Sequence, residues 1–278
     1  MKKKPKFIDK IGFMQGRLSI KEFNKIQSFP IDNWKNEFAV ANLMSLKKME
    51  WTIDYDFFYK NPLMNKIYHE EIINLKKIYK INVDSVTCDF LMNKPFWKIK
   101  NNKRLINDFE FFLKNCIKLS IKKIIIPLVD NGSLKTKKEE VILKKILKKM
   151  IKKKKFRNLI FLFESDFIAK KIKPFFNNLN KKNFGINYDL GNSASLGHRI
   201  KIDFQEYSDL IKNVHLKDRK LKGHTVKFGK GSADFVSLFK FLKNMNYKGN
   251  LILQCARSQN NNDIKEFQQN LNFIKKLL

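Results

Sequence analysis

The chain has 278 residues, of which 43% are hydrophobic, and this composition excludes both a disordered protein and a minimal domain. Its length fits one large α/β barrel, which typically takes about 250 residues. The formal net charge is +32, but lysines occur in nearly every segment and are not gathered into one basic arm. We therefore interpret the charge as solvated surface and expect no nucleic-acid partner despite it.

The cysteines indicate a reducing compartment. Cys88, Cys116 and Cys255 are odd in number and have no paired spacing, which favours free thiols in a cytoplasmic protein. The basic N-terminus is not followed by an apolar region long enough for a signal peptide. No stretch approaches the roughly 18 consecutive apolar residues of a membrane span, so we expect none.

Short apolar runs alternate with longer amphipathic segments along the whole chain. The apolar runs predict strands at 11–14, 49–53, 83–88, 124–129, 159–163, 185–188, 214–216 and 250–253. Helical periodicity predicts helices at 32–46, 63–79, 101–119, 135–155, 166–179, 204–210, 233–245 and 263–278. We expect Pro174 to interrupt the fifth of these helices.

This alternation predicts the fold class. Apolar strands flanked by helices imply a parallel sheet buried on both faces. Eight such units in a chain of 278 residues imply a closed (β/α)8 TIM barrel, which we assign as a single domain over residues 1–278. An open doubly wound sheet is the competing fold, but no G-x-G-x-x-G motif follows the first strand.

Polar side chains follow the last four predicted strands. Glu164, Asp189, His215 and Gln254 each end an apolar run, and intervals of 25 and 26 residues separate the first three. Because the C-terminal ends of barrel strands share one rim, we expect these four side chains to meet there. Two carboxylates, an imidazole and an amide oxygen predict one divalent cation, with Mn²⁺ or Mg²⁺ favoured over a structural zinc.

Each of these residues also has a structural interpretation. A lone aspartate at a strand end is often a helix N-cap, and a lone histidine is more often structural than a ligand. Four such residues in register on consecutive strands favour the metal site over these separate explanations.

Four motifs carry a family resemblance. They are Gly-Phe-Met-Gln-Gly-Arg-Leu-Ser at 12–19, Asn-Tyr-Asp-Leu-Gly-Asn-Ser-Ala-Ser-Leu-Gly at 187–197, His-Leu-Lys-Asp-Arg at 215–219 and Leu-Gln-Cys-Ala-Arg at 253–257. Together they resemble the xylose-isomerase-like TIM-barrel superfamily, and within it the sugar phosphate isomerase/epimerase group. The resemblance implies a TIM barrel and a metal held by Glu164, Asp189, His215 and the position of Gln254.

The resemblance also implies a catalytic role for Glu164, either as the base that moves a proton or as a ligand only. In the ketose 3-epimerases of this superfamily a second glutamate acts on the other face of the substrate. Gln254 stands at that position, and a glutamine binds a metal through its oxygen but does not exchange a proton at neutral pH. Asn192 replaces a histidine of those epimerases, so symmetric two-base epimerisation is in question.

Further polar residues are expected near the mouth of the barrel. The side chains that we predict to bind substrate are Arg17, Glu50, Asn192, Lys217, Arg219 and Arg257. Arg17 and Glu50 could instead brace the rim through ion pairs. The segment 229–232 precedes a helix, and we expect its N–H groups to be available to a phosphate.

The function that we predict is that of a divalent-metal-dependent isomerase or epimerase acting on a sugar or sugar phosphate through an enediolate. One alternative is a metal-dependent dehydratase on the same barrel. Another is an abasic-site nuclease-like or nucleic-acid-binding protein, although the chain has only 4 histidines for a multi-metal centre. The last alternative is a barrel that binds a ligand but does not catalyse a reaction. No sequence feature predicts an oligomeric state.

Overall fold

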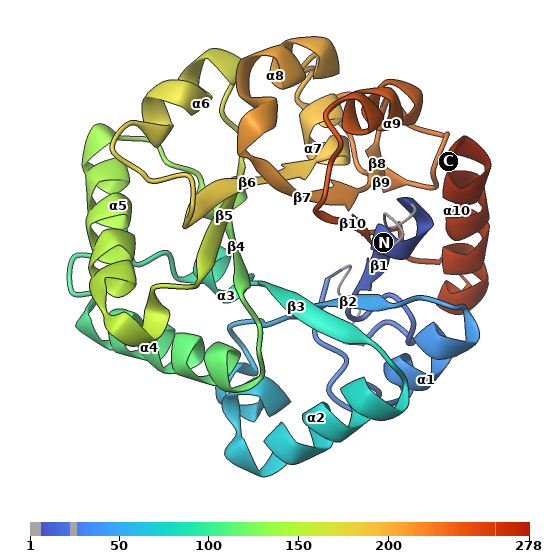
Figure 1. Ribbon diagram of the computed structural model, residues 1–278, viewed down its shortest axis with the longest axis horizontal. Helices are drawn as coiled ribbons and strands as arrows, with labels where there is room; N and C mark the ends of the chain where they lie inside the picture. The colour runs from blue at the N-terminus through green and yellow to red at the C-terminus, as the bar shows by residue number, and fades with distance from the viewer. Residues whose placement is uncertain (1–6, 23–26, 259) are drawn as a thin grey trace, which may run out of the picture.

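A computed structural model describes residues 7–22, 27–258 and 260–278. Within them, eight parallel strands close into a barrel in the order β1-β10-β7-β6-β5-β4-β3-β2 (Figure 1). The barrel strands are β1 (Ile11–Met14), β2 (Lys48–Thr52), β3 (Asn82–Thr87), β4 (Lys123–Leu128), β5 (Ile160–Ser165), β6 (Phe184–Asp189), β7 (Ile211–Leu216) and β10 (Asn250–Leu253). The predicted (β/α)8 TIM barrel is confirmed.

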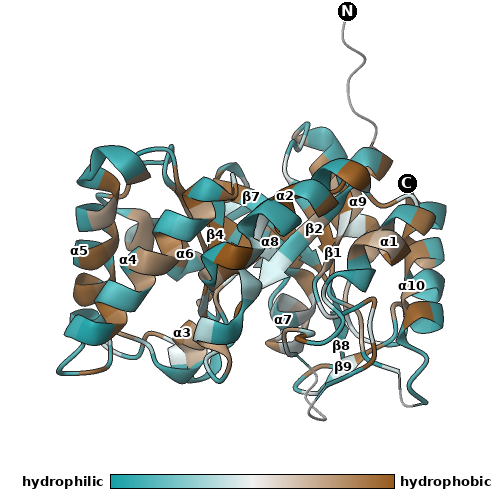
Figure 2. Ribbon diagram, turned by 90° about the horizontal axis from the view of Figure 1, so that it is seen from below, coloured by the Kyte–Doolittle hydropathy of each residue, from teal (hydrophilic) through white to brown (hydrophobic). Residues whose placement is uncertain are grey.

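Helices surround the barrel (Figure 1). They are α1 (Asn36–Leu43), α2 (His69–Ile78), α3 (Phe90–Asn93), α4 (Lys103–Lys118), α5 (Lys137–Lys152), α6 (Ala169–Phe176), α7 (Leu190–Ser195), α8 (Ile200–Tyr207), α9 (Phe235–Asn244) and α10 (Asp263–Leu277). A short antiparallel hairpin of β8 (Asp218–Arg219) and β9 (Thr225–Val226) follows β7. Figure 2 shows α3, α7 and this hairpin at the same end of the barrel, where the strands have their C-terminal ends.

Phenylalanines fill the layer between strands and helices. Successive side chains of a strand point to opposite faces, so every second residue points away from the barrel axis. Phe163 of β5 packs edge-on against Phe175 of α6, with ring centroids 5.0 Å apart, and stacks on Phe184 of β6 at 6.1 Å. Phe13 of β1 similarly meets Phe267 of α10. The intervening residues therefore point inward, and this row carries the polar side chains.

The predicted helix at 63–79 differs from the structure. The segment 63–79 begins as two 3-10 turns, Pro62–Met64 and Lys66–Tyr68, and becomes α-helical only from His69. The side chains of Asn61 and Asn65 accept hydrogen bonds from backbone N–H groups two residues later, and these local bonds stabilise separate short turns.

The fifth predicted helix also differs. Pro174 lies inside α6 and does not break it, but the helix ends two residues later at Phe176, short of the predicted 179. Among the described residues, no helix is both long enough and apolar enough to cross a membrane.

We expect Phe163→Ala to lower the free energy of unfolding by about 3–5 kcal/mol, because it removes a fully buried ring and leaves a cavity between β5 and α6. Leu43→Ala, at a side chain that is 85% exposed, is the control and should cost no more than about 0.5 kcal/mol. Urea unfolding measures both. Equal losses would contradict the assignment of Phe163 to the packed layer.

Candidate functional site

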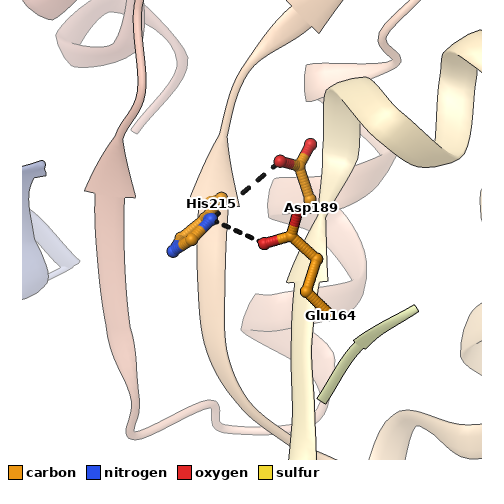
Figure 3. Close-up of side chains that lie close together, drawn as sticks. All are labelled: Glu164, Asp189 and His215. Atoms are coloured by element: carbon orange, nitrogen blue, oxygen red, sulfur yellow. Dashed lines mark ion pairs between the residues drawn. The ribbon is translucent and has the colours of Figure 1, made fainter. Parts of the chain in front are cut away.

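Three of the predicted metal ligands converge at the C-terminal ends of β5, β6 and β7 (Figure 3). His215 Nδ1 lies 3.1 Å from Glu164 Oε2 and 3.9 Å from Asp189 Oδ2. All three residues are buried, and one ligand atom from each lies within 4.8 Å of the others. Parallel pairing sets this geometry, because the ladder between β6 and β7 places Asp189 directly beside His215.

Glu50 of β2 holds the far side of the imidazole. His215 Nε2 lies 2.6 Å from Glu50 Oε1, and both side chains are fully buried. Thr87 Oγ1 donates to the same carboxylate at 2.7 Å and Asn213 Nδ2 donates at 3.0 Å. A carboxylate acceptor favours the proton on Nε2, which directs Nδ1 toward Glu164. Glu50 therefore lies beneath the site, where it holds His215 in place. This position agrees with the structural role considered for Glu50 and not with contact to a substrate.

Amide groups fix both oxygens of Glu164. Asn187 Nδ2 donates to Oε2 at 2.8 Å, and Asn192 Nδ2 donates to Oε1 at 2.7 Å. Arg219 Nη1 in turn donates to Asn192 Oδ1 at 2.9 Å. Burial favours the neutral carboxyl, but the neighbouring His215 outweighs it and holds the pKa of Glu164 below its ordinary value. Glu164 is thus kept ionised, as a metal ligand or a base requires.

Asp189 combines two roles. Its Oδ1 accepts from Asn192 N at 2.7 Å and caps α7, as a strand-end aspartate often does. Its Oδ2 is buried and has no hydrogen-bond partner among the described residues, although Lys217 Nζ lies 3.5 Å away. Burial raises the pKa of Asp189, and Lys217 partly offsets this. Gly191 permits the close approach, since a Cβ there would lie 2.7 Å from the Lys217 side chain.

Gln254 continues the inward-facing row of β10. Its backbone N–H donates to Leu216 O at 2.9 Å, so it follows the strand next to His215. Its side-chain Oε1 is buried and finds no hydrogen-bond partner in the part of the chain that the structure describes. Burying a carbonyl oxygen without a hydrogen-bond donor costs free energy, so we expect a ligand to bind this atom.

These donors fit a divalent cation. The ligand atoms that lie together are one from each of Glu164, Asp189 and His215, and Gln254, which follows the neighbouring strand β10, is the predicted fourth member. Two of these atoms, Asp189 Oδ2 and Gln254 Oε1, are buried acceptors without a hydrogen-bond donor among the described residues. Glu164, Asp189 and His215 could therefore hold a metal ion.

Arg257 is occupied by contacts within the protein. Its guanidinium donates to the carbonyl oxygens of Gly16 and Ser19, and it lies 3.5 Å from Asp263 Oδ2. The carboxylate of Glu37 binds the N–H groups of the same loop, including Gly16 N at 2.9 Å. Arg257 thus joins the end of β10 to the loop after β1. This geometry does not support the predicted substrate contact.

Of the remaining residues predicted to bind substrate, Asn192 and Lys217 contact the cluster of Glu164, Asp189 and His215, whereas Arg219 and Arg17 have other partners. Arg219 acts through Asn192, and its other nitrogens donate to Gly223 O. Arg17 is 4% exposed, and its Nη2 donates to Gln27 Oε1 at 2.6 Å. Burial and the charge of Arg257 lower the pKa of Arg17 to about 10.

The expected phosphate loop at 229–232 is wrong. The carboxylate of Asp218 accepts hydrogen bonds from Gly229 N at 2.8 Å, Gly231 N at 3.0 Å and Ala233 N at 3.1 Å. These N–H groups are therefore not available to an external anion. A Cβ at Gly231 would lie 2.1 Å from Asp218 Oδ1, so only glycine fits this turn.

Two residues of the site were missed in the sequence. Asn187 and Asn213 lie two positions before Asp189 and His215, on the same inward faces. Asn213 Nδ2 donates to Asn187 Oδ1 at 2.8 Å, which orients the amide that binds Glu164. The alternation of strand side chains was the signal that could have identified them.

We expect metal binding to displace a proton from His215. Burial opposes the charged imidazole, but Glu50 and Glu164 outweigh burial and raise the pKa of His215 to about 10. This proton stabilises the metal-free fold below pH about 6.5, and the contribution is lost as the pH rises through about 10. Affinity for Mn²⁺ should therefore rise by up to about tenfold per pH unit between roughly pH 6 and 9.

Calorimetry in buffers of different ionisation enthalpy would measure the protons released, with about one expected for each Mn²⁺ ion. His224→Asn, at an exposed loop histidine, is the matched control and should not change the release. A pH-independent affinity would show that His215 is not a ligand.

We expect Arg257→Ala to act on stability, because it removes a partner from two carbonyls and from the Asp263 carboxylate. The loss should be about 3–5 kcal/mol in urea unfolding, as for breaking a buried ion pair. Lys265→Ala, at an exposed lysine of α10, is the control. Unchanged stability with a raised KM would restore the substrate-binding role.

Comparison with known proteins agrees with the fold and the motifs. A family model described as "Xylose isomerase-like TIM barrel" matches residues 143–277. A putative L-ribulose-5-phosphate 3-epimerase of Haemophilus influenzae is 30% identical over 98 residues, which are 33% of this chain and 34% of that protein. The match thus spans about a third of the length of this curated relative.

Solved structures extend the similarity over the whole barrel. The 3-keto-D-glucoside 4-epimerase YcjR of E. coli superposes with a TM-score of 0.70 at 15% identity, covering 96% of this chain and 99% of that one. The IolI protein, solved with a bound zinc atom, gives a TM-score of 0.70 at 12% identity and covers 97% of this chain and 99% of that one. The family model over residues 143–277 and the whole-chain likeness to these structures agree with the TIM-barrel fold and with the resemblance that the motifs carry.

Proposed function

We propose that this chain is a divalent-metal-dependent isomerase or epimerase of a sugar or sugar phosphate. The observation that carries the proposal is the buried cluster of Glu164, Asp189 and His215 at the C-terminal rim of the barrel. This rim is where TIM-barrel enzymes have their active sites. Gln254 joins the cluster as the fourth ligand in the proposal, and the metal is Mn²⁺ or Mg²⁺.

Glu164 is the base in this proposal. It is ionised, and the amides of Asn187 and Asn192 aim both of its oxygens at fixed positions. A positioned carboxylate takes the proton from the carbon next to a carbonyl and leaves an enediolate. A divalent cation held by Glu164, Asp189 and His215 would supply positive charge that stabilises the negative charge of the enediolate. Lys217, 3.5 Å from Asp189, adds a further cation to this side of the site.

The relatives support the substrate class. The H. influenzae relative is described as a ribulose-phosphate 3-epimerase and the E. coli structure as a keto-glucoside 4-epimerase. Both names describe inversion at a sugar carbon. The occupied loop at 229–232 gives no support for a phosphate site there. Sugars and their phosphates therefore both belong in the test.

The test is a proton-exchange screen in deuterated water with Mn²⁺-loaded protein and a panel of sugars and sugar phosphates. We expect deuterium at the carbon next to the carbonyl of at least one sugar. Glu164→Gln should lower this exchange by at least about 100-fold, because the general base is lost. Glu206→Gln, at a half-exposed glutamate of α8 that pairs with Lys173, is the matched control and should exchange like the wild type.

Two outcomes would count against the proposal. Exchange that persists in Glu164→Gln with metal retained would remove Glu164 as the base. No exchange by the wild type across the panel would remove the isomerase or epimerase activity itself. The dehydratase alternative is favoured by Gln254, which does not exchange a proton, and loss of water from a panel sugar would support it.

A further inference from the structure

Gln254 leaves the proposed reaction with one base, but another carboxyl group lies at the same rim. Asp89 follows β3 and is 7% exposed. Its Oδ2 is buried and has no hydrogen-bond partner among residues 7–22, 27–258 and 260–278. The neighbouring Cys88 packs into the outer hydrophobic core, whereas Thr87 points inward to the Glu50 carboxylate. Asp89 is the N-cap residue of α3, in αR conformation, and the charges of Glu164 and His215 act on its carboxyl, so it lies near the cluster at this rim.

Asp89 is part of an arc of polar atoms that lack partners. Gln15 Nε2, Thr52 Oγ1 and Gln254 Oε1 are also buried without a hydrogen bond to any described residue. These residues stand at the C-terminal ends of β1, β2 and β10, and with β3 they occupy four neighbouring positions of the barrel. The metal cluster lies on the other arc, formed by β5, β6 and β7. A ligand between the two arcs would complete hydrogen bonds on one side and contact the cluster on the other.

We propose that Asp89 is the second proton-transfer group of the site, a proton donor that replaces the carboxyl missing at Gln254. The inference rests on the proposed function and narrows it to epimerisation at the carbon next to the carbonyl. Glu164 and Asp89 come from β5 and from the end of β3, which β4 separates, so a carbon held between them would meet the two carboxyls from different directions. Glu164 breaks the C–H bond and takes the proton. Protonated Asp89 then forms a new C–H bond at the same carbon, and solvent restores both groups.

The surroundings of Asp89 favour the protonated form. Burial raises its pKa well above the ordinary value, and the nearby carboxyls of Asp54 and Glu164 raise it further. His215 and Arg17 act in the opposite direction without reversing the shift. A carboxyl that keeps its proton is what a proton donor requires.

The test separates proton removal from inversion, using the Mn²⁺-loaded protein and a sugar found in the exchange screen. Asp89→Asn should still exchange the substrate hydrogen with deuterated water within about threefold of the wild type, because Glu164 remains. Formation of the epimer should fall by at least about 100-fold. Asp89→Glu should recover part of the epimerisation. Asp89→Ser, a second way to remove the carboxyl, should give the same split if Asp89→Asn does not fold.

Asp84→Asn is the matched control, since Asp84 is also an aspartate of β3 but pairs with Lys123 and Asn250, away from the cluster. It should leave both rates unchanged. Calorimetric Mn²⁺ affinity should be unchanged in Asp89→Asn. Wild-type epimerisation in Asp89→Asn, or a parallel loss of exchange, epimerisation and Mn²⁺ binding, would overturn the role of Asp89 alone. Absence of exchange in the wild type would instead remove the proposed function and this inference with it.

Discussion

The 2.6 Å contact between His215 and Glu50 is the interaction on which the geometry of the site depends. Both groups are fully buried, so water is not available as a substitute partner, and removing one would leave the other without its shortest polar contact. The contact spans the barrel from β2 to β7. It continues through His215 Nδ1 to Glu164 on β5, so three walls of the barrel are joined by one chain of polar contacts. The contacts that align Glu164 and His215 are therefore the same contacts that connect β2, β7 and β5 across the barrel.

Around this contact, neutral amide side chains hydrogen-bond to the charged groups. Asn187, Asn192 and Asn213 add donors and acceptors without adding charge to a crowded site. They stabilise the ionised Glu164 while leaving Asp189 Oδ2 with no donor among the described residues. One carboxylate is thus satisfied by donors within the protein, whereas the other keeps a buried oxygen that accepts no hydrogen bond from a described residue and could bind a cation. Such a division of roles is typical of a metal site with an adjacent base.

The strand ends were predictable because they depend on local pattern. Apolar runs ending at Glu164, Asp189 and His215 identified their rim positions, and the spacing matched one β/α unit each. Contacts between distant segments were not predictable in this way. Glu50 meets a residue 165 positions away, and Arg257 meets Gly16 at a separation of 241. Both were assigned to substrate from their place at the rim, and only the folded chain shows which internal partners take up their hydrogen-bonding groups.

Asp218 determines whether the loop at 229–232 can bind an external anion. The N–H groups of this loop form a concave anion nest of the kind that elsewhere receives phosphate. Here the anion is a side chain of the protein, covalently attached and present at all times. An external phosphate would have to compete with a tethered carboxylate whose effective concentration no free ligand reaches. Exclusion of anions from this nest is therefore encoded by one residue, and loss of the Asp218 carboxylate would expose a ready-made binding surface.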